Sequence, residues 1–119
     1  MAGEALFIGW GQVVRGREKL GLGVFQESVE YWGKLQQDGK IEGFDVFLLA
    51  PHGGDLAGFA ILRGEAQSLS QVRFSNEFDR LIARAGSVVD NIGVVIAYSG
   101  DALARQMGLF QEAADEFGG

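Results

Sequence analysis

Residues 41–63, "IEGFDVFLLAPHGGDLAGFAILR", decide the fold. Two runs rich in bulky apolar residues, 41–50 and 56–63, lie on either side of "PHGGD" at 51–55. Proline, glycine and aspartate favour turns, so two such runs joined by a turn segment predict a β-hairpin. The middle of the chain therefore supplies two neighbouring antiparallel strands.

The segments before and after the hairpin have the patterns of further strands and helices. Apolar residues between 22 and 32 recur three and four positions apart, which is the spacing of one helix face. A cap at Ser68 or Ser70 is expected for the second helix. The expected elements are, in chain order, a strand at 5–14, a helix from 23 or 24 to about 38, the hairpin strands, a helix at about 70–85, a strand at 88–99 and a helix from 101 to about 117.

The order β-α-β-β-α-β followed by a terminal helix predicts an α+β fold of the ferredoxin-like type. We expect a four-stranded antiparallel sheet with two helices on one face, and the terminal helix at an edge, over part of the open face, or on a second subunit. A length of 119 residues and the lack of a linker favour one domain spanning 1–119.

Composition excludes several classes of function. The net charge of -6 and the dispersed basic residues disfavour nucleic acid as a partner. The chain has no cysteine, which excludes disulfides, thiolate metal sites and cysteine nucleophiles. With a single histidine we expect no metal site, and we expect no bound cofactor. No apolar run is long enough to predict a membrane span, and "MAGEALFIGWG" has no basic leader, so a cytoplasmic location is expected.

The strands are apolar at both odd and even positions, although an antiparallel sheet with one face in water normally alternates apolar and polar residues. Each large apolar side chain left exposed forgoes about 1.5–3 kcal/mol of burial. We therefore expect the open face to pack on a second copy, as a two-fold homodimer or a higher homo-oligomer. Positions of one parity within the strands collect Leu6, Ile8, Trp10, Phe44, Val46, Leu48, Phe59, Ile61, Ile92, Val94 and Ile96, and positions of the other parity collect Phe7, Asp45, Phe47, Leu49, Ala60, Leu62, Val95 and Ala97. The sequence leaves open how these parities align from strand to strand, but any alignment leaves both faces largely apolar.

This layout resembles the dimeric α+β barrel superfamily, in which two ferredoxin-like subunits pack sheet to sheet. The likeness covers residues 5–117, and it is one of layout, without a catalytic motif that would carry over active residues. The superfamily includes cofactor-free monooxygenases, small lactone isomerases, haem-binding enzymes and many uncharacterised proteins. The resemblance implies a fold and an oligomer, and it leaves the catalytic residues unknown.

Two candidate site residues belong to the hairpin. His52 could be a metal ligand, a haem ligand or a general base, but a histidine in a Pro-Gly-Gly turn typically faces solvent. Asp45 lies within an apolar strand, where an unpaired carboxylate is costly to bury. It either pairs across the sheet with an arginine such as Arg63, or lines a cavity as an acid, a base or a ligand anchor.

Three further candidates lie near the strand ends. Asn91 shares its parity with small residues, which together with Gly9, Gly11, Gly43 and Gly58 either pack closely or outline a pocket. Trp10 and Tyr98 could place amphipathic rings at the rim of such a pocket.

The sequence supports two functional hypotheses and leaves open whether the protein is an enzyme. The first is a small homodimeric protein of unknown function that binds a small, largely apolar molecule. The alternative is a cofactor-independent enzyme of the monooxygenase or isomerase type, acting on a small organic substrate.

Overall fold

The computed structural model describes residues 3–118. Its elements are β1 (Glu4–Trp10), α1 (Glu18–Gln37), β2 (Gly43–Leu48), β3 (Gly58–Arg63), α2 (Ala66–Arg73), α3 (Asn76–Gly86), β4 (Gly93–Tyr98) and α4 (Gly100–Glu116). The strands form one antiparallel sheet in the order β2-β3-β1-β4. The predicted ferredoxin-like architecture is confirmed, with β2 and β4 as the edge strands.

Several predicted boundaries are wrong: β1 ends at Trp10 and not at residue 14, and three further differences have a local reason. Helix α1 begins at Glu18 because the glycines after it are helical, and Gly21 packs against Val13 from the preceding loop. The second predicted helix is two helices, because Ser75 is extended and its Oγ accepts a hydrogen bond from the backbone N–H of Phe78 at 3.2 Å. Ser75, rather than Ser68 or Ser70, is therefore the capping residue. The fourth strand begins at Gly93, and the segment before it is a turn.

The register of β3 shows how the odd and even positions of the strands align across the sheet. Leu62 pairs with Leu6, and Ala60 pairs with Ile8, so Ala60 and Leu62 share the face of Leu6 and Ile8. Cross-strand partners point to the same side of a sheet. The loop 49–57 fixes this register, whereas the bulk of the side chains does not reveal it. Phe59 and Ile61 therefore lie on the opposite face, with Phe7 and Phe47.

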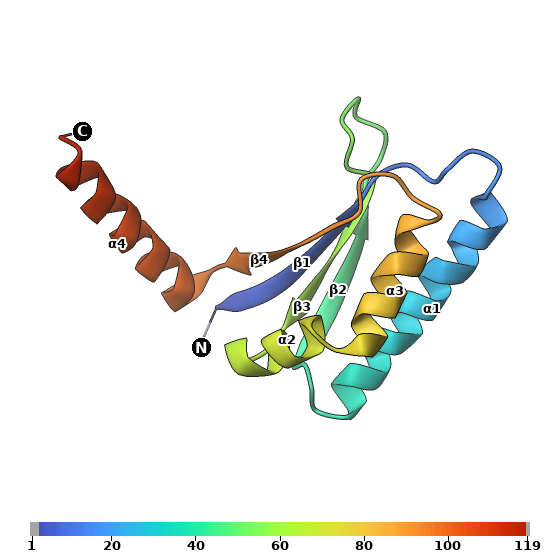
Figure 1. The fold of residues 1–119 in the computed structure, drawn as a ribbon, viewed down its shortest axis with the longest axis horizontal. Coiled ribbons are helices and arrows are strands. Elements are labelled where there is room, and N and C mark those ends of the chain that lie inside the picture. The colour runs from blue at the N-terminus through green and yellow to red at the C-terminus, as the bar shows by residue number, and fades with distance from the viewer. Residues whose placement is uncertain (1–2, 119) are drawn as a thin grey trace.

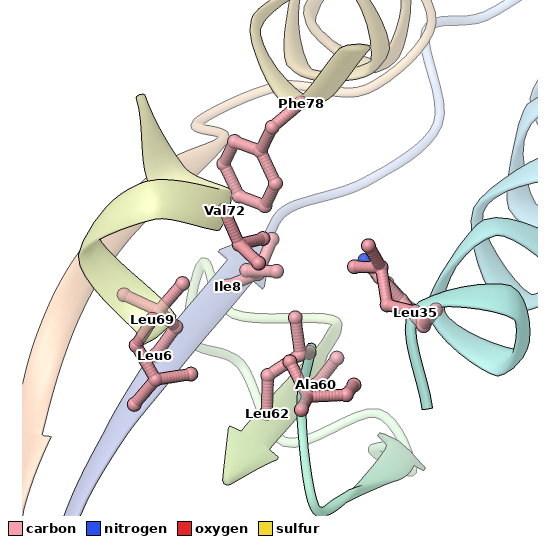
Figure 2. Close-up of a cluster of buried hydrophobic side chains, with 10 residues drawn as sticks. Leu6, Ile8, Leu35, Ala60, Leu62, Leu69, Val72 and Phe78 are labelled. Atoms are coloured by element: carbon pink, nitrogen blue, oxygen red, sulfur yellow. The ribbon is translucent and has the colours of Figure 1, made fainter. Parts of the chain in front are cut away.

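Helices α1, α2 and α3 cover one face of the sheet (Figure 1). Figure 2 shows Leu69 and Val72 of α2 and Phe78 of α3 directed at Leu6 and Ile8 of β1. Leu6, Ile8, Leu62 and Phe78 are large apolar side chains that are almost fully buried. This core fixes the helices over the central strands, and it leaves a separate space where α1 begins and α3 ends.

Helix α4 projects away from the end of β4 and does not return to the sheet (Figure 1). None of its residues is buried, although Leu103, Met107 and Phe110 are large and apolar. The helix thus leaves the open face of its own sheet uncovered. Within residues 3–118, no helix combines the length and apolar character that crossing a membrane requires.

Candidate ligand cavity and the predicted site residues

A cavity of about 340 Å³ lies between the helix-covered face of the sheet and helices α1 and α3. Its walls are almost entirely apolar. Two exposed lining residues at the start of α1, Glu18 and Leu22, mark the mouth of the cavity. Two buried lining residues, Ile8 and Trp32, mark its floor. The other lining residues are Trp10, Val13, Gly21, Val24, Phe25, Ser28, Leu48, Leu81, Ile82, Ala85, Val88, Val89 and Ile92.

Aromatic rings form two parts of the wall. Trp10, at the end of β1, meets Phe25 of α1 edge to face, with ring centroids 6.2 Å apart. Trp32, two turns further along α1, lies tilted against Phe44 of β2 at 6.0 Å. Positions 25, 28 and 32 follow the three-and-four spacing of one helix face, so α1 presents all three to the cavity.

The two buried polar side chains of the cavity differ in their hydrogen bonding. The Ser28 hydroxyl donates to the Val24 carbonyl oxygen at 2.8 Å, so its donor is satisfied inside the helix. The Trp32 indole N–H is buried and has no acceptor among residues 3–118. A buried donor without an acceptor costs about 1–3 kcal/mol. This nitrogen has almost no surface that a water-sized molecule could touch, so its burial belongs to the packing of the core.

Charge is scarce in the cavity. Glu18 is the one titratable residue among the described residues that line it. Its Oε1 accepts a hydrogen bond from the Gly16 N–H at 3.1 Å, and the residue is exposed at the mouth. The interior therefore suits an uncharged ligand, because a charge placed there would have no counter-ion.

A second, polar depression of about 460 Å³ lies on the other side of α1. Tyr31, Lys34 and Ser75 are among its lining residues. Burial raises the pKa of Tyr31 above 10.0, a hydrogen bond with Ser75 partly offsets this, and the Glu77 carboxylate adds to the increase. The depression has no unpartnered buried donor comparable to that of Trp32.

Of the five predicted site residues, Trp10 alone lines the apolar cavity. Asp45 lies on the open face of the sheet, where it accepts a hydrogen bond from the Arg63 guanidinium. The cross-sheet pair with Arg63, one of the two alternatives for Asp45, is the one that the structure contains.

His52 lies in the hairpin loop and is bonded to that loop through both ring nitrogens. Its Nε2 is 2.7 Å from the Leu56 carbonyl oxygen, and its Nδ1 accepts from the Gly54 N–H at 3.2 Å. These two bonds assign the donor role to Nε2. The ring thus closes the turn, and it lies outside the cavity lining.

Asn91 and Tyr98 lie apart from each other and from the cavity. Asn91 is in the turn before β4 with a φ of 58°, a left-handed conformation that asparagine tolerates better than most residues. Tyr98 ends β4 at the opposite end of the sheet, where it pairs with Glu4.

Among the small residues that could either outline a pocket or pack closely, Gly9, Gly11 and Gly58 each leave no room for a side chain, because an added methyl group would meet another atom at 2.8 Å. These three glycines pack closely, which was the other interpretation, whereas no atom lies within 4 Å of where a side chain at Gly93 would begin.

Sequence reasoning missed Trp32, Phe25 and Ser28. The signal was present, because Trp32 and Phe25 belong to the apolar stripe of α1. That stripe is equally typical of a helix packed on a filled core, so the spacing alone does not distinguish a core from a cavity wall.

Comparison with known proteins adds information on the fold. No family model matches the sequence, and no curated protein matches it. Among solved structures, the chain is similar to a dimeric protein of unknown function with a ferredoxin-like fold from Bacteroides fragilis, with a TM-score of 0.59 and 12% identity over 82% of this chain and 97% of that one. It is also similar to an ethyl tert-butyl ether D (EthD) family protein from Bacillus halodurans, with a TM-score of 0.61 and 11% identity over 82% of this chain and 98% of that one.

A third similar structure is SnoaB, a cofactor-independent oxygenase from Streptomyces nogalater, with a TM-score of 0.56 and 14% identity over 86% of this chain and 98% of that one. These identities are low, so the likeness is one of fold. It confirms the ferredoxin-like layout predicted from the order of elements.

Proposed function

We propose that this chain is a homodimeric protein of the cytoplasm that binds a small, largely apolar molecule between its sheet and helices α1 and α3. The cavity of about 340 Å³ carries this proposal. Ligand sites are typically concave, apolar and supplied with a few polar groups, and this cavity has those properties together with a mouth at Glu18 and Leu22.

The open face of the sheet supports the dimer. Phe59 stacks with Phe7 at 5.1 Å on one side and with Phe47 at 5.0 Å on the other, which forms an aromatic row across three strands. Val95 on β4 is 56% exposed beside it. An apolar surface of this kind on a small domain marks an interface, and a two-fold pairing is the commonest way to cover it.

Helix α4 supports the same assembly. Its apolar side chains have no surface to pack on in their own subunit, since the helix leaves the sheet (Figure 1). Phe110 is 70% exposed. Of the three placements expected for the terminal helix, contact with a second subunit is the one that would bury this stripe. The Bacteroides fragilis protein of similar fold is itself dimeric.

A cofactor-independent oxygenase is the second candidate, supported by the fold shared with SnoaB. Such an enzyme needs a base that takes a proton from its substrate. Glu18 would have to serve, because Asp45, His52 and Asn91 lie outside the cavity lining. Oxygen uptake in the presence of a bound ketone, lost on Glu18→Gln with binding retained, would favour this candidate over a binding protein.

Ligand binding is tested by filling the cavity. Ala85 of α3 lines it, and Ala83 on the same helix is exposed. We expect the apolar bicyclic hydrocarbon tetralin to change the tryptophan fluorescence of the wild-type protein on binding. Ala85→Leu should weaken this binding roughly tenfold or more by occupying the space, and Ala83→Leu should leave it unchanged. Failure of the wild-type protein to bind tetralin, or equal binding by the Ala85→Leu variant, would contradict the proposal.

The oligomer is tested by native mass spectrometry of the protein as purified. A mass of twice 12.8 kDa, with or without a retained ligand, is expected. A monomer at micromolar concentration would contradict the proposed dimer.

A further inference from the structure

We propose that helix α4 of each subunit docks on the second copy, in an apolar groove between β4 and helices α2 and α3. This inference rests on the proposed dimer and specifies which surfaces of the two copies meet outside the open face of the sheet. The carrying observation is that one chain presents both an unburied apolar helix and an uncovered apolar groove.

The groove follows the edge strand β4 on the helix side of the sheet. Two hollows of about 290 and 90 Å³ adjoin there, and Arg73 and Phe74 at the end of α2 line both. Phe74 is 73% exposed. Ile96 of β4 lines the smaller hollow and is 46% exposed, whereas its cross-strand partner Leu6 is 2% exposed. The helices of the same subunit therefore cover β1 and stop short of β4.

Helix α4 has the surface that such a groove requires. Five of its apolar positions recur four and three residues apart and form one stripe, and its charged residues lie on the opposite face. The stripe consists of Leu103, Met107, Phe110, Ala114 and Phe117. A helix with one apolar stripe is typical of a helix that packs on protein, yet no residue of α4 is buried in the single subunit.

The link between β4 and α4 keeps the helix out of the groove of its own subunit. Ser99 alone separates Tyr98 of the strand from Gly100 of the helix. Its backbone N–H and its Oγ both donate to the carbonyl oxygen of Gly3, at 2.7 and 3.1 Å. These bonds hold the direction in which α4 leaves the sheet (Figure 1). Folding back would require the first turn of α4 to unwind, so the helix meets the groove of another copy.

Strand β4 connects this contact to the open face of the sheet. Val95 on the open side and Ile96 on the groove side are 56% and 46% exposed, so the strand is uncovered on both sides. A partner that packs on the open face and sends its α4 around the β4 edge covers both sides of the strand. The helix thus adds to the contact between the sheets, and the same two copies make both.

The charge of α4 disfavours a membrane as the surface that covers its apolar stripe. The helix has four acidic residues and one arginine. Helices that lie on membranes typically carry lysine and arginine on their polar face, which attract anionic headgroups. An acidic face is repelled by such headgroups, whereas it stays in water when the stripe docks on protein.

The experiment is photo-cross-linking of the full chain. The photoreactive residue p-benzoylphenylalanine replaces Phe110, in the middle of the stripe, or Glu112, on the charged face, as the control. Dimers are formed from a mixture of ordinary and nitrogen-15-labelled chains and are then irradiated and digested. Mass spectrometry of the linked peptides identifies the contact, and mixed-isotope products show that it joins two subunits.

We expect position 110 to link to peptides that contain Phe74 or Ile96 of the partner subunit, and position 112 to give much less of this product. Links to the partner's α4, to the open face of the sheet or within one chain would overturn the docking of α4 in the groove. So would the absence of any link in a dimeric sample. Each of these results leaves the proposed dimer standing, whereas a monomeric wild-type protein contradicts the dimer and this inference together.

A second measurement alters the groove and leaves α4 unchanged. Phe74→Ser should raise the dissociation constant of the dimer about tenfold or more, because a large apolar side chain is lost from the contact. Leu20→Ser is the matched control, since Leu20 is an exposed apolar residue of α1 that does not line the groove. Analytical ultracentrifugation over a range of concentrations measures both constants. Equal constants for the two variants would overturn the inference even if the p-benzoylphenylalanine chain fails to fold.

Discussion

Arg63 donates a hydrogen bond to Asp45 from the neighbouring strand, on the face of the sheet that the described helices leave open. Each side chain is about half exposed in the single subunit. An ion pair in that setting contributes about 0–1 kcal/mol, because water screens it. Between two packed sheets the same pair would lose its water, and removing one partner would leave the other charge buried.

We predict that Asp45→Ala lowers the free energy of unfolding of the dimer by about 2–5 kcal/mol, well above the value for an exposed pair. The double variant Asp45→Ala, Arg63→Met should recover part of this loss, because it removes the unpaired guanidinium. Urea unfolding at a fixed protein concentration measures both. A loss under about 1 kcal/mol for Asp45→Ala would show that the open face stays in water.

The aromatic row on the same face gives a more direct test of the dimer. Phe59 is its central ring, in contact with Phe7 and Phe47. We predict that Phe59→Asp converts the dimer to a folded monomer, since a carboxylate would otherwise be buried against the partner. Leu20→Asp is the control, because Leu20 is an exposed apolar residue of α1, away from this face. Light scattering after size-exclusion chromatography separates the outcomes, and a Phe59→Asp dimer would contradict sheet-to-sheet packing.

The order of elements could be predicted from the sequence because periodicity and turn residues are local signals. The hairpin around residues 51–55 is the clearest case. The faces of the sheet could not be assigned from the sequence, because the register of β3 depends on how the loop before it closes, which composition does not reveal. The break at Ser75 was missed because an apolar helical spacing continues across it.

The candidate site was harder still to predict. A cavity is a property of how helices sit on a sheet, and an apolar stripe has the same sequence whether or not the space beside it is filled. The search for polar and titratable residues led to Asp45 and His52, which are bonded within the hairpin. Trp32 contributes to the cavity wall, although its position in the sequence indicated only the core.

Two glycines provide opposite predictions for stability. Gly33 lies within α1 with open space where a side chain would be, so Gly33→Ala should stabilise the protein by about 0.5–1 kcal/mol through its helix propensity. Gly11 lies between backbone oxygens of Asp90 and Asp55, at 2.8 and 3.0 Å from an added methyl group. Gly11→Ala should destabilise it by about 1–3 kcal/mol. Thermal unfolding measures both, and a neutral Gly11→Ala would show that the turn before β4 relaxes easily.

His52 should be dispensable for binding. Its ring nitrogens are bonded to Leu56 and Gly54 in an exposed loop, so His52→Gln should lower the free energy of unfolding by less than about 1 kcal/mol. The affinity for tetralin should equal that of the wild-type protein, because the residue is outside the cavity lining. Loss of ligand binding with the fold intact would instead place His52 in the site.

The raised pKa of Tyr31 predicts how stability changes in alkali. Burial keeps the phenol neutral in the folded protein at a pH where the unfolded chain, with a value near 10.0, already ionises. The unfolded state then binds fewer protons than the folded state, so stability falls as the pH rises from about 10 through the higher pKa of the folded protein. Below pH 10 this contribution is fully present. Tyr31→Phe removes the ionisation in both states, and we expect its stability to decline less than that of the wild-type protein between about pH 9.5 and 11. Urea unfolding at intervals across that range measures the difference, and parallel declines for the two proteins would show that the Tyr31 ring is hydrated in solution.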